Sequence, residues 1–151
     1  MRAPHAQANS ADGRPIRTLV ADDFAAWRNA VIDILAAEDN VAIVGQARNG
    51  REALIEVEKL RPDVAVLDVN MPEMDGIEAA RRIKARFPSV RVVGLSSSEG
   101  PGTIKAMTDA GADAYVTKSA AFLQLVDVIR ALYRDAMDEP DDQPEGLGGP
   151  K

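Results

Sequence analysis

Five short apolar runs, separated by stretches with helical periodicity, constrain the fold of this chain more than any other feature. The runs are IRTLVA (16–21), VAIVGQ (41–46), DVAVLD (63–68), VRVVGL (90–95) and DAYVTK (113–118). Near-continuous apolar runs of this length suit strands that are covered on both faces, as in parallel sheets. Because crossovers between parallel strands are right-handed, the alternation predicts an α/β fold of the (βα)₅ type with a doubly wound, parallel five-stranded sheet.

Four of the intervening stretches carry an apolar stripe at helical spacing. We expect Asn49 and Ser119 to cap the second of these helices and the last one, because short polar side chains satisfy the free N–H groups of a first turn. The expected stripes are Trp27, Val31, Ile34 and Leu35 in 24–38; Leu54, Val57 and Leu60 in 50–60; Ile77, Ala80, Ile83 and Phe87 in 76–87; and Phe122, Leu125, Val126, Ile129 and Leu132 in the last helix.

The stretch between the fourth and fifth runs, SSSEGPGTIKAMTDAG, has a weaker helical pattern. Its glycines and its proline lower the summed helix propensity, and its apolar stripe consists only of Ile104 and Met107. We therefore expect a short and loosely held helix within 99–111.

Length and composition indicate one folded domain with two polar ends. The chain has 151 residues, which suits one hydrophobic core. Residues 1–15 lack periodicity, and residues 135–151 are acidic and rich in Pro and Gly, so both are expected to be disordered. The predicted domain is 16–134.

Several classes of protein are excluded by composition. The chain has no cysteine and a single histidine, His5, which argues against a disulfide scaffold, a zinc site and a Ser-His-Asp triad. No apolar run approaches the ~18 residues of a membrane span, and no signal peptide is visible, so a cytoplasmic protein without membrane contact is expected. The net charge of −6 gives no basic excess for direct nucleic-acid binding.

Polar side chains follow four of the predicted strands, at the edge where such sheets bind ligands. They are Asp22 and Asp23, Asp68, Ser96, and Lys118. In the commoner strand order, 2-1-3-4-5, the first and third strands are neighbours ~4.8 Å apart, so the three aspartates would crowd one crevice. Each of these residues alone could simply cap a turn, but the combination favours a functional site.

Such a cluster of carboxylates needs a cation. Two like charges ~4 Å apart repel by about 4 kcal/mol at an effective dielectric constant of ~20. Oxygen ligands without histidine or cysteine indicate a hard ion, Mg²⁺ first and Mn²⁺ second. Since Mg²⁺ keeps open positions for water and phosphate oxygens, the sequence predicts a site that handles phosphate.

At these residues the chain resembles the CheY-like receiver domain of response regulators in two-component signalling, over about 16–134. The motifs are the acidic pair after the first strand and the segments LDVNMPEMDG, VVGLSSSEG and GADAYVTKS. The wording is closest to the LuxR/NarL-type subgroup, which usually carries a DNA-binding domain. Because only a short acidic segment follows the last helix here, we expect a stand-alone receiver or a fragment of a longer regulator.

The resemblance implies a role for each residue at the strand ends. Asp68 would be the phosphoacceptor. Asp23, Asp68 and the backbone carbonyl of Asn70 would bind Mg²⁺ directly, and Asp22 would act through a water or a neighbouring ligand. Lys118 would pair with the carboxylate or with the phosphoryl oxygens.

The resemblance also implies a switch. Ser96, chosen among three consecutive serines by its spacing from Lys118, would move to bind the phosphoryl group. Tyr115 would then turn inward, unless it simply packs on the neighbouring helix. The face formed by the weak helix, the fifth strand and the last helix would change as a result.

The expected partners are a histidine kinase or a histidine phosphotransfer protein, and then a downstream protein or a second copy bound through the changed face. The charged residues suggested for a dimer are Asp109, Asp113, Arg130 and Arg134. The chain would catalyse only its own phosphorylation and dephosphorylation. Two alternatives remain: a Mg²⁺-dependent phosphohydrolase with an aspartyl-phosphate intermediate, for which Asn70 is a poor general acid, and a binding module that works without phosphorylation.

Overall fold

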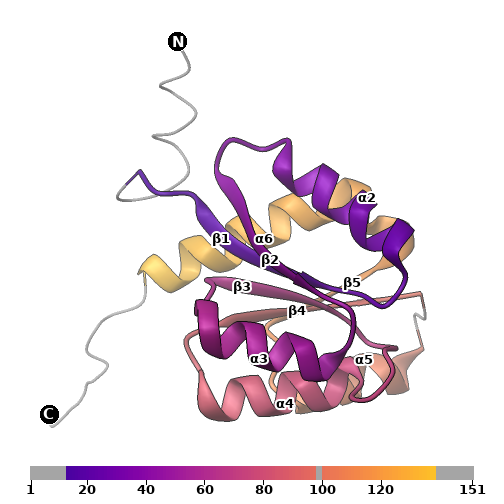
Figure 1. Cartoon of the computed structure of the whole chain (residues 1–151). Coiled ribbons are helices and arrows are strands. Elements are labelled where there is room, and N and C mark those ends of the chain that lie inside the picture. Colours follow the sequence, from indigo (N-terminus) through magenta and orange to yellow (C-terminus); the bar gives the residue numbers. More distant parts are fainter. Residues whose placement is uncertain (1–12, 98–99, 139–151) are drawn as a thin grey trace, which may run out of the picture.

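The computed structural model describes residues 13–97 and 100–138, which form a five-stranded parallel sheet between two layers of helices (Figure 1). The strand order is β2-β1-β3-β4-β5, as predicted. The strands are β1 (Ile16–Ala21), β2 (Val41–Ala47), β3 (Val64–Asp68), β4 (Arg91–Ser96) and β5 (Ala114–Thr117). The helices are α2 (Ala25–Ala36), α3 (Gly50–Leu60), α4 (Gly76–Arg86), α5 (Pro101–Asp109), the 3₁₀ turn η1 (Lys118–Ala120) and α6 (Ala121–Asp138).

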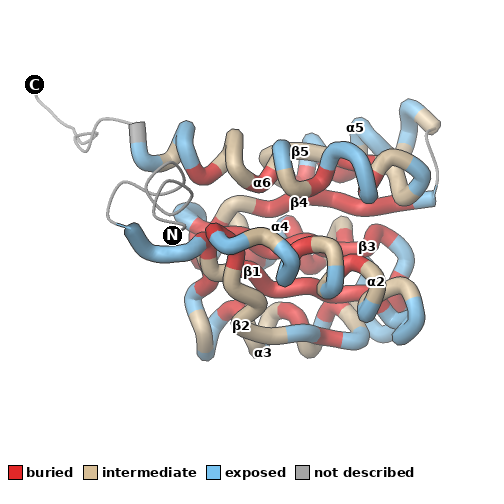
Figure 2. Tube along the Cα trace, turned by 90° about the horizontal axis from the view of Figure 1, so that it is seen from above, coloured by how far each residue is buried: buried red, intermediate tan, exposed pale blue. Residues whose placement is uncertain are grey.

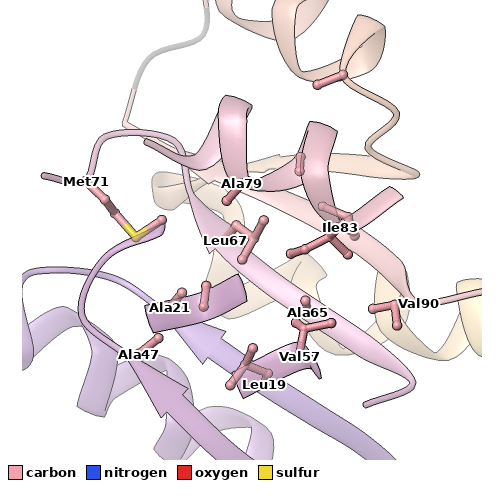
Figure 3. Close-up of a cluster of buried hydrophobic side chains, with 14 of the residues drawn as sticks. Leu19, Ala21, Ala47, Val57, Ala65, Leu67, Met71, Ala79, Ile83 and Val90 are labelled. Carbon is pink, nitrogen blue, oxygen red and sulfur yellow. The ribbon is translucent and has the colours of Figure 1, made fainter. Parts of the chain in front are cut away.

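The two layers of helices bury two separate hydrophobic clusters against the sheet. Helices α2 and α6 cover one face, where Val31, Leu35, Leu125 and Ile129 pack together. Helices α3, α4 and α5 cover the other face, where Leu19, Ala65 and Leu67 point toward Val57, Ala79 and Ile83 (Figure 3). Every residue of β3 is buried, and the buried positions concentrate in the strands (Figure 2). The sheet therefore holds the ends of β1, β3 and β4 in fixed relative positions.

Side-chain caps begin α3 and α4 as their sequences suggest. Asn49 Oδ1 accepts a hydrogen bond from the backbone N–H of Glu52 at 2.8 Å, which confirms the predicted N-cap. Asp75 Oδ1 accepts one from the N–H of Glu78 at 2.9 Å. Each cap satisfies one of the free N–H groups of a first helical turn, so each fixes the loop that leads into its helix.

The last helix differs from the prediction at its beginning and on its buried face. Ser119 is not its N-cap, because residues 118–120 form the 3₁₀ turn η1 instead. Phe122, expected in the core, is 56% exposed. The residues that α6 buries are Ala121, Leu125, Ile129 and Tyr133, which follow each other at intervals of four. Leu125 and Ile129 are buried as predicted, and Val126 and Leu132 pack against the core, so Phe122 is the one member of the predicted stripe that leaves the buried face.

Two smaller expectations also differ. In α2, Ile32 rather than Ile34 packs against the core, although both are half-buried. Helix α6 continues to Asp138, so residues 135–138 of the expected tail are helical. The remaining residues of the two expected disordered ends, 1–12 and 139–151, lie outside the described part of the chain.

Helix α5 is short, as predicted, and has little contact with the core. It begins at Pro101 without a side-chain cap, and Met107 is its one fully buried residue. In the described ranges 13–97 and 100–138, no helix has the length and apolarity to cross a membrane.

Candidate functional site

Three carboxylates meet at the carboxyl edge of the sheet. β1 and β3 are paired in parallel, with Ala21 opposite Leu67, so the residues after β1 lie beside the end of β3. Asp22, Asp23 and Asp68 each place one carboxylate oxygen within 4.8 Å of the others. Asp22 and Asp68 are buried, whereas Asp23 is exposed. The arrangement offers two inner ligands and one ligand at the rim, which could hold a metal ion.

Lys118 lies between the two buried carboxylates. It leaves the end of β5 in η1, and its Nζ is 3.0 Å from Asp22 Oδ2 and 3.5 Å from Asp68 Oδ2. One lysine offsets one of the three negative charges of the cluster. Asp22 Oδ2 is buried, and the ammonium group of Lys118 is the positive group that lies next to it.

Burial controls the acidity of Asp68. It raises the pKa of this carboxyl group from 3.8 to about 6, and the nearby charge of Asp22 acts in the same direction. Lys118 and the N–H of Asn70, which is 3.4 Å from Asp68 Oδ1, oppose the increase. The high pKa of Asp68 means that its ionised form has too little positive charge around it.

The chemistry of this donor set fits a hard divalent cation. All three side chains are carboxylates, the ligands that Mg²⁺ and Mn²⁺ prefer. Asp22 and Asp68 share one lysine, and the raised pKa of Asp68 indicates unmet demand for positive charge at this position. Asn70 presents an exposed side chain next to the cluster, while its backbone N–H faces Asp68.

The loop after β3 is held by close backbone contacts. A Cβ atom at Gly76 would lie 2.2 Å from the backbone oxygen of Asp68, and the N–H of Gly76 donates to the Val69 carbonyl at 2.8 Å. Met71 is buried and points toward Ala47 and Ala21 (Figure 3). The start of α4 therefore fixes the backbone of Asp68 directly.

The two expected switch residues occupy neighbouring strands. Ser96 is the last residue of β4 and is fully buried, and the residue before it, Leu95, pairs with Asp68. Ser96 thus lies one strand away from the cluster. Tyr115 pairs with Gly94 further back in the sheet, where its half-buried ring packs against the cluster that also contains Met107 of α5. Of the neighbouring serines, Ser97 is exposed and Ser98 lies outside the described residues.

Several residues near the site were not predicted as parts of it. The Trp27 ring lies 5.3 Å from Lys118 Nζ and 5.6 Å, centroid to centroid, from the ring of Phe122. Arg28 donates from Nη1 to the backbone carbonyl of Asp22 at 2.8 Å. Helical spacing places Trp27 toward the sheet, but nothing in the sequence indicates its contact with a lysine about ninety residues later.

Comparison with known proteins places this geometry in a family. Residues 18–130 match the model of the response regulator receiver domain. The chain is 36% identical over 118 residues to the response regulator GacA of Pseudomonas viridiflava, covering 78% of this chain and 55% of that protein. It is 43% identical over 107 residues to a protein-glutamate methylesterase/protein-glutamine glutaminase of a Nocardioides species, covering 70% of this chain and 29% of that protein.

A solved receiver-domain structure is also similar to this chain. The receiver domain of the response regulator NarL from Mycobacterium tuberculosis superposes with a TM-score of 0.75 at 28% identity, covering 83% of this chain and 99% of that one. The chain spans about half the length of GacA and less than a third of the methylesterase, so what those relatives share with it is their receiver part. The chain belongs to the response regulator receiver domain family.

Proposed function

We propose that this protein is a phosphorylation-activated receiver that accepts a phosphoryl group on Asp68 with the help of Mg²⁺ and signals by binding another protein. The observation that carries the proposal is the meeting of Asp22, Asp23 and Asp68 within 4.8 Å, with Lys118 Nζ between the two buried carboxylates. A bound Mg²⁺ would neutralise the oxygens of the incoming phosphoryl group. Mn²⁺ is expected to substitute for it.

Each residue of the site would have its own role in phosphoryl transfer. Asp68, ionised above its pKa of about 6, attacks the phosphorus of a phosphohistidine. A P–O bond forms while the P–N bond breaks, and the imidazole nitrogen keeps the electron pair and takes a proton from solvent. Lys118 lies 3.5 Å from Asp68 and stabilises the transferred charge. Asp22, Asp23 and the backbone carbonyl of Asn70 would hold the metal.

The switch would use the buried hydroxyl beside the site. Ser96 would turn toward the phosphoryl oxygens, and Tyr115 would move into the space it leaves. Helix α5, which buries only Met107, is the element that such a movement can displace at small energetic cost. The α5, β5 and α6 face would then bind a downstream protein or a second copy of the chain.

The phosphoryl donor would be a histidine kinase or a histidine phosphotransfer protein. We include a cytoplasmic location in the proposal, because the ATP that such a kinase uses is found there. The chain would not turn over an external substrate, and its chemistry would be limited to gaining and losing its own phosphoryl group.

The test is phosphoryl transfer from acetyl phosphate or a purified kinase, followed by intact-protein mass. The wild type should gain one phosphoryl group in the presence of Mg²⁺ and none when chelator is in excess from the start, and Asp68→Asn should gain none. Asp33→Asn, an exposed change in α2, is the matched control and should react like the wild type. Labelling that persists in Asp68→Asn would contradict the assignment.

The phosphohydrolase alternative has its own readout. Steady turnover of a simple phosphate ester, lost in Asp68→Ala, would support it over the receiver proposal. Asn70 lies two positions after Asp68, where such an enzyme generally uses a second acid, so we expect no turnover. If the phosphomimic complex and the unmodified chain bind the same partner equally well, the phosphorylation-independent module is the correct function.

A further inference from the structure

A second charged region lies at the amino edge of the sheet, opposite the acidic cluster. Two adjoining pockets of about 610 and 350 Å³ open there, between the starts of β1, β3 and β4 and the ends of α3, α4 and α6. Five arginines and one aspartate are the charged side chains that line them: Arg14, Arg17, Arg61, Arg86, Arg91 and Asp63. Arg17 already donates to the carbonyls of Leu60 and Arg61, and Arg91 pairs with Asp113, so Arg61 and Arg86 are the arginines of interest for binding an acid.

Two of these arginines are fixed around one aromatic ring. The guanidinium carbons of Arg61 and Arg86 lie 4.4 Å and 5.0 Å from the centroid of the Phe87 ring. Stacking on an aromatic face orients a guanidinium group and leaves its N–H edge available. Ordering these side chains in advance lowers the entropy that they lose when they bind a carboxylate.

The donors of this pair are only partly used. Arg61 donates from Nε to the backbone carbonyl of Glu58 at 3.1 Å, and Arg86 Nη2 is 3.3 Å from Glu58 Oε1. Within the described ranges, no group accepts a hydrogen bond from the two terminal nitrogens of Arg61. Glu58 and Asp63 are the acids that face the pair, and Asp63 binds the backbone N–H of Arg17 at 2.8 Å.

The backbone at Arg61 adds a second observation. Arg61 has φ 46° and ends α3 in the left-handed conformation, a position that glycine occupies at lowest cost. An arginine in this backbone conformation is less stable than a glycine, and the contacts of its side chain offset that difference. Its stacking on Phe87 at the mouth of the larger pocket is consistent with a binding role.

The chain itself supplies an acidic segment next to this surface. Helix α6 contributes Tyr133, Ala136 and Met137 to the lining of the larger pocket, so the chain leaves the helix at the pocket. The sequence that follows, EPDDQPE (139–145), contains four acids and no base. An extended chain advances up to ~3.5 Å per residue, so seven residues are long enough to span the pocket.

We propose that the acidic segment 139–145 docks within the same molecule onto the arginine surface formed by Arg61, Arg86 and the residues beside them. Single exposed ion pairs contribute only about 0–1 kcal/mol, but attachment to α6 gives the segment a high effective concentration, so several weak pairs act together. The docking lies at the edge opposite Asp68 and does not depend on phosphorylation of that residue.

Paramagnetic relaxation in the 151-residue chain tests the docking. Because the chain has no cysteine, Gln143→Cys carries a single nitroxide. We expect strong broadening of the amide signals of Asp63 and Val90, and none at Asp23 on the opposite edge. Removing three of the four negative charges of the segment (Asp141→Asn, Asp142→Asn and Glu145→Gln) should abolish most of the broadening. Adding ~1 M salt, which shortens the Debye length to ~3 Å, should do the same.

Two pairs of substitutions separate docking from general charge. Arg61→Gln with Arg86→Gln should abolish the broadening, whereas Arg81→Gln with Arg82→Gln, which removes two exposed arginines paired with Glu78 on the same α4, should leave it intact. Arg61→Gly is a further test with a small risk of misfolding, because glycine favours the left-handed backbone there. It should retain stability and weaken docking.

Three results would overturn the proposal. The first is broadening that is equal at both edges or insensitive to the charge of the segment. The second is broadening of the same size when the labelled chain is mixed with an unlabelled, isotope-enriched chain, which would show contact between molecules. The third is a response of Arg61 and Arg86 side-chain signals to inorganic phosphate without any broadening from the label, which would make this a site for a small anion.

Discussion

At the residue scale, the chemistry of the site depends on three carboxylates and one lysine. Asp68 is buried beside Asp22, and its pKa is raised to about 6 because burial and the nearby carboxylate destabilise its charged form. The ammonium group of Lys118 stabilises the charged form of Asp68 from 3.5 Å, but it also pairs with the carboxylate of Asp22 at 3.0 Å. The carboxylates could thus hold a cation, and without one their burial costs the fold some stability.

The raised pKa of Asp68 predicts a pH-dependent stability. Folded Asp68 holds its proton up to about pH 6 while the unfolded chain releases it near 3.8, so the folded state loses relative stability as pH rises between these values. In chelator, Asp68→Asn should therefore raise the free energy of unfolding at pH 8 by on the order of 2 kcal/mol. The difference should shrink below pH 4, and denaturant titrations at both pH values measure it. A constant difference would contradict the argument.

The position of Trp27 predicts an optical signal for metal binding. Trp27 is the only tryptophan of the chain, and its ring lies 5.3 Å from Lys118 Nζ. Mg²⁺ should move Lys118 and change the fluorescence of Trp27. Asp23→Asn should weaken the apparent affinity about tenfold or more, while Asp33→Asn on the exposed side of α2 should leave it unchanged. Equal titration curves for all three proteins would remove Asp23 from the metal site.

Some contacts of the site can be predicted from the sequence and others cannot. Strand ends and strand order together predict that Asp22, Asp23, Asp68 and Lys118 gather at one edge, since a parallel sheet aligns all carboxyl ends. The contact of Trp27 with Phe122 and Lys118 could not be predicted, because it depends on the relative rotation of two helices that are distant in sequence.

At the element scale, the helices differ in how firmly they hold the site. Helix α4 begins against the backbone of Asp68, whereas α5 contributes one buried side chain. The apolar pattern predicts this contrast, since α4 has a full stripe and α5 has two apolar positions. The pattern does not predict the 3₁₀ turn before α6. A turn of three residues is too short to show an apolar periodicity of its own.

Glycine 76 provides a test of how α4 positions the site. A Cβ there would lie 2.2 Å from the Asp68 carbonyl oxygen, so Gly76→Ala must displace either α4 or Asp68. We expect a loss of at least about 2 kcal/mol in unfolding free energy and slower phosphorylation. Gly102→Ala in α5 is the matched control, because nothing lies within 4 Å of its Cβ position and alanine favours a helix. Equal effects would contradict the contact.

The weak attachment of α5 predicts rapid local opening. Amide protons of Pro101–Asp109 that are hydrogen-bonded should exchange faster than those of Gly76–Arg86, because fewer buried contacts resist opening. The phosphomimic beryllofluoride should slow the exchange in α5 and leave α4 almost unchanged. Hydrogen-exchange mass spectrometry measures both, and equal protection of the two helices would count against α5 as the movable element.

At the scale of the whole molecule, the proposed output surface is the face formed by α5, β5 and α6. Three of the four charged residues suggested for a dimer have partners within their own chain. Asp109 pairs with Lys105, Asp113 with Lys84, and Arg130 with Glu38. Patterns of charge along one helix do not reveal such partners, because Glu38 and Arg130 are ninety-two positions apart in sequence. Arg134 is exposed, as is Asp109, and within the described ranges Arg134 is the member of the set without an ion pair.

Dimerisation on activation is therefore tested most directly at Arg134. With Mg²⁺ and beryllofluoride, light scattering after size-exclusion chromatography should show the mass of a dimer, and Arg134→Glu should weaken it. Arg51→Glu on α3 makes the same change in charge on the other layer and should have no effect. A monomer under all these conditions would shift the output to a different protein.

The two ends of the sheet carry opposite charge, with carboxylates beyond β1 and β3 and arginines at the starts of the same strands. Such a separation gives the molecule an electric dipole moment along its strands. A charged partner that approaches from solution is rotated by this field before it touches the surface, so it meets one edge more often than the other. An acidic segment that covers the arginines would reduce this dipole moment. It would therefore also reduce the torque that orients a charged partner as it approaches.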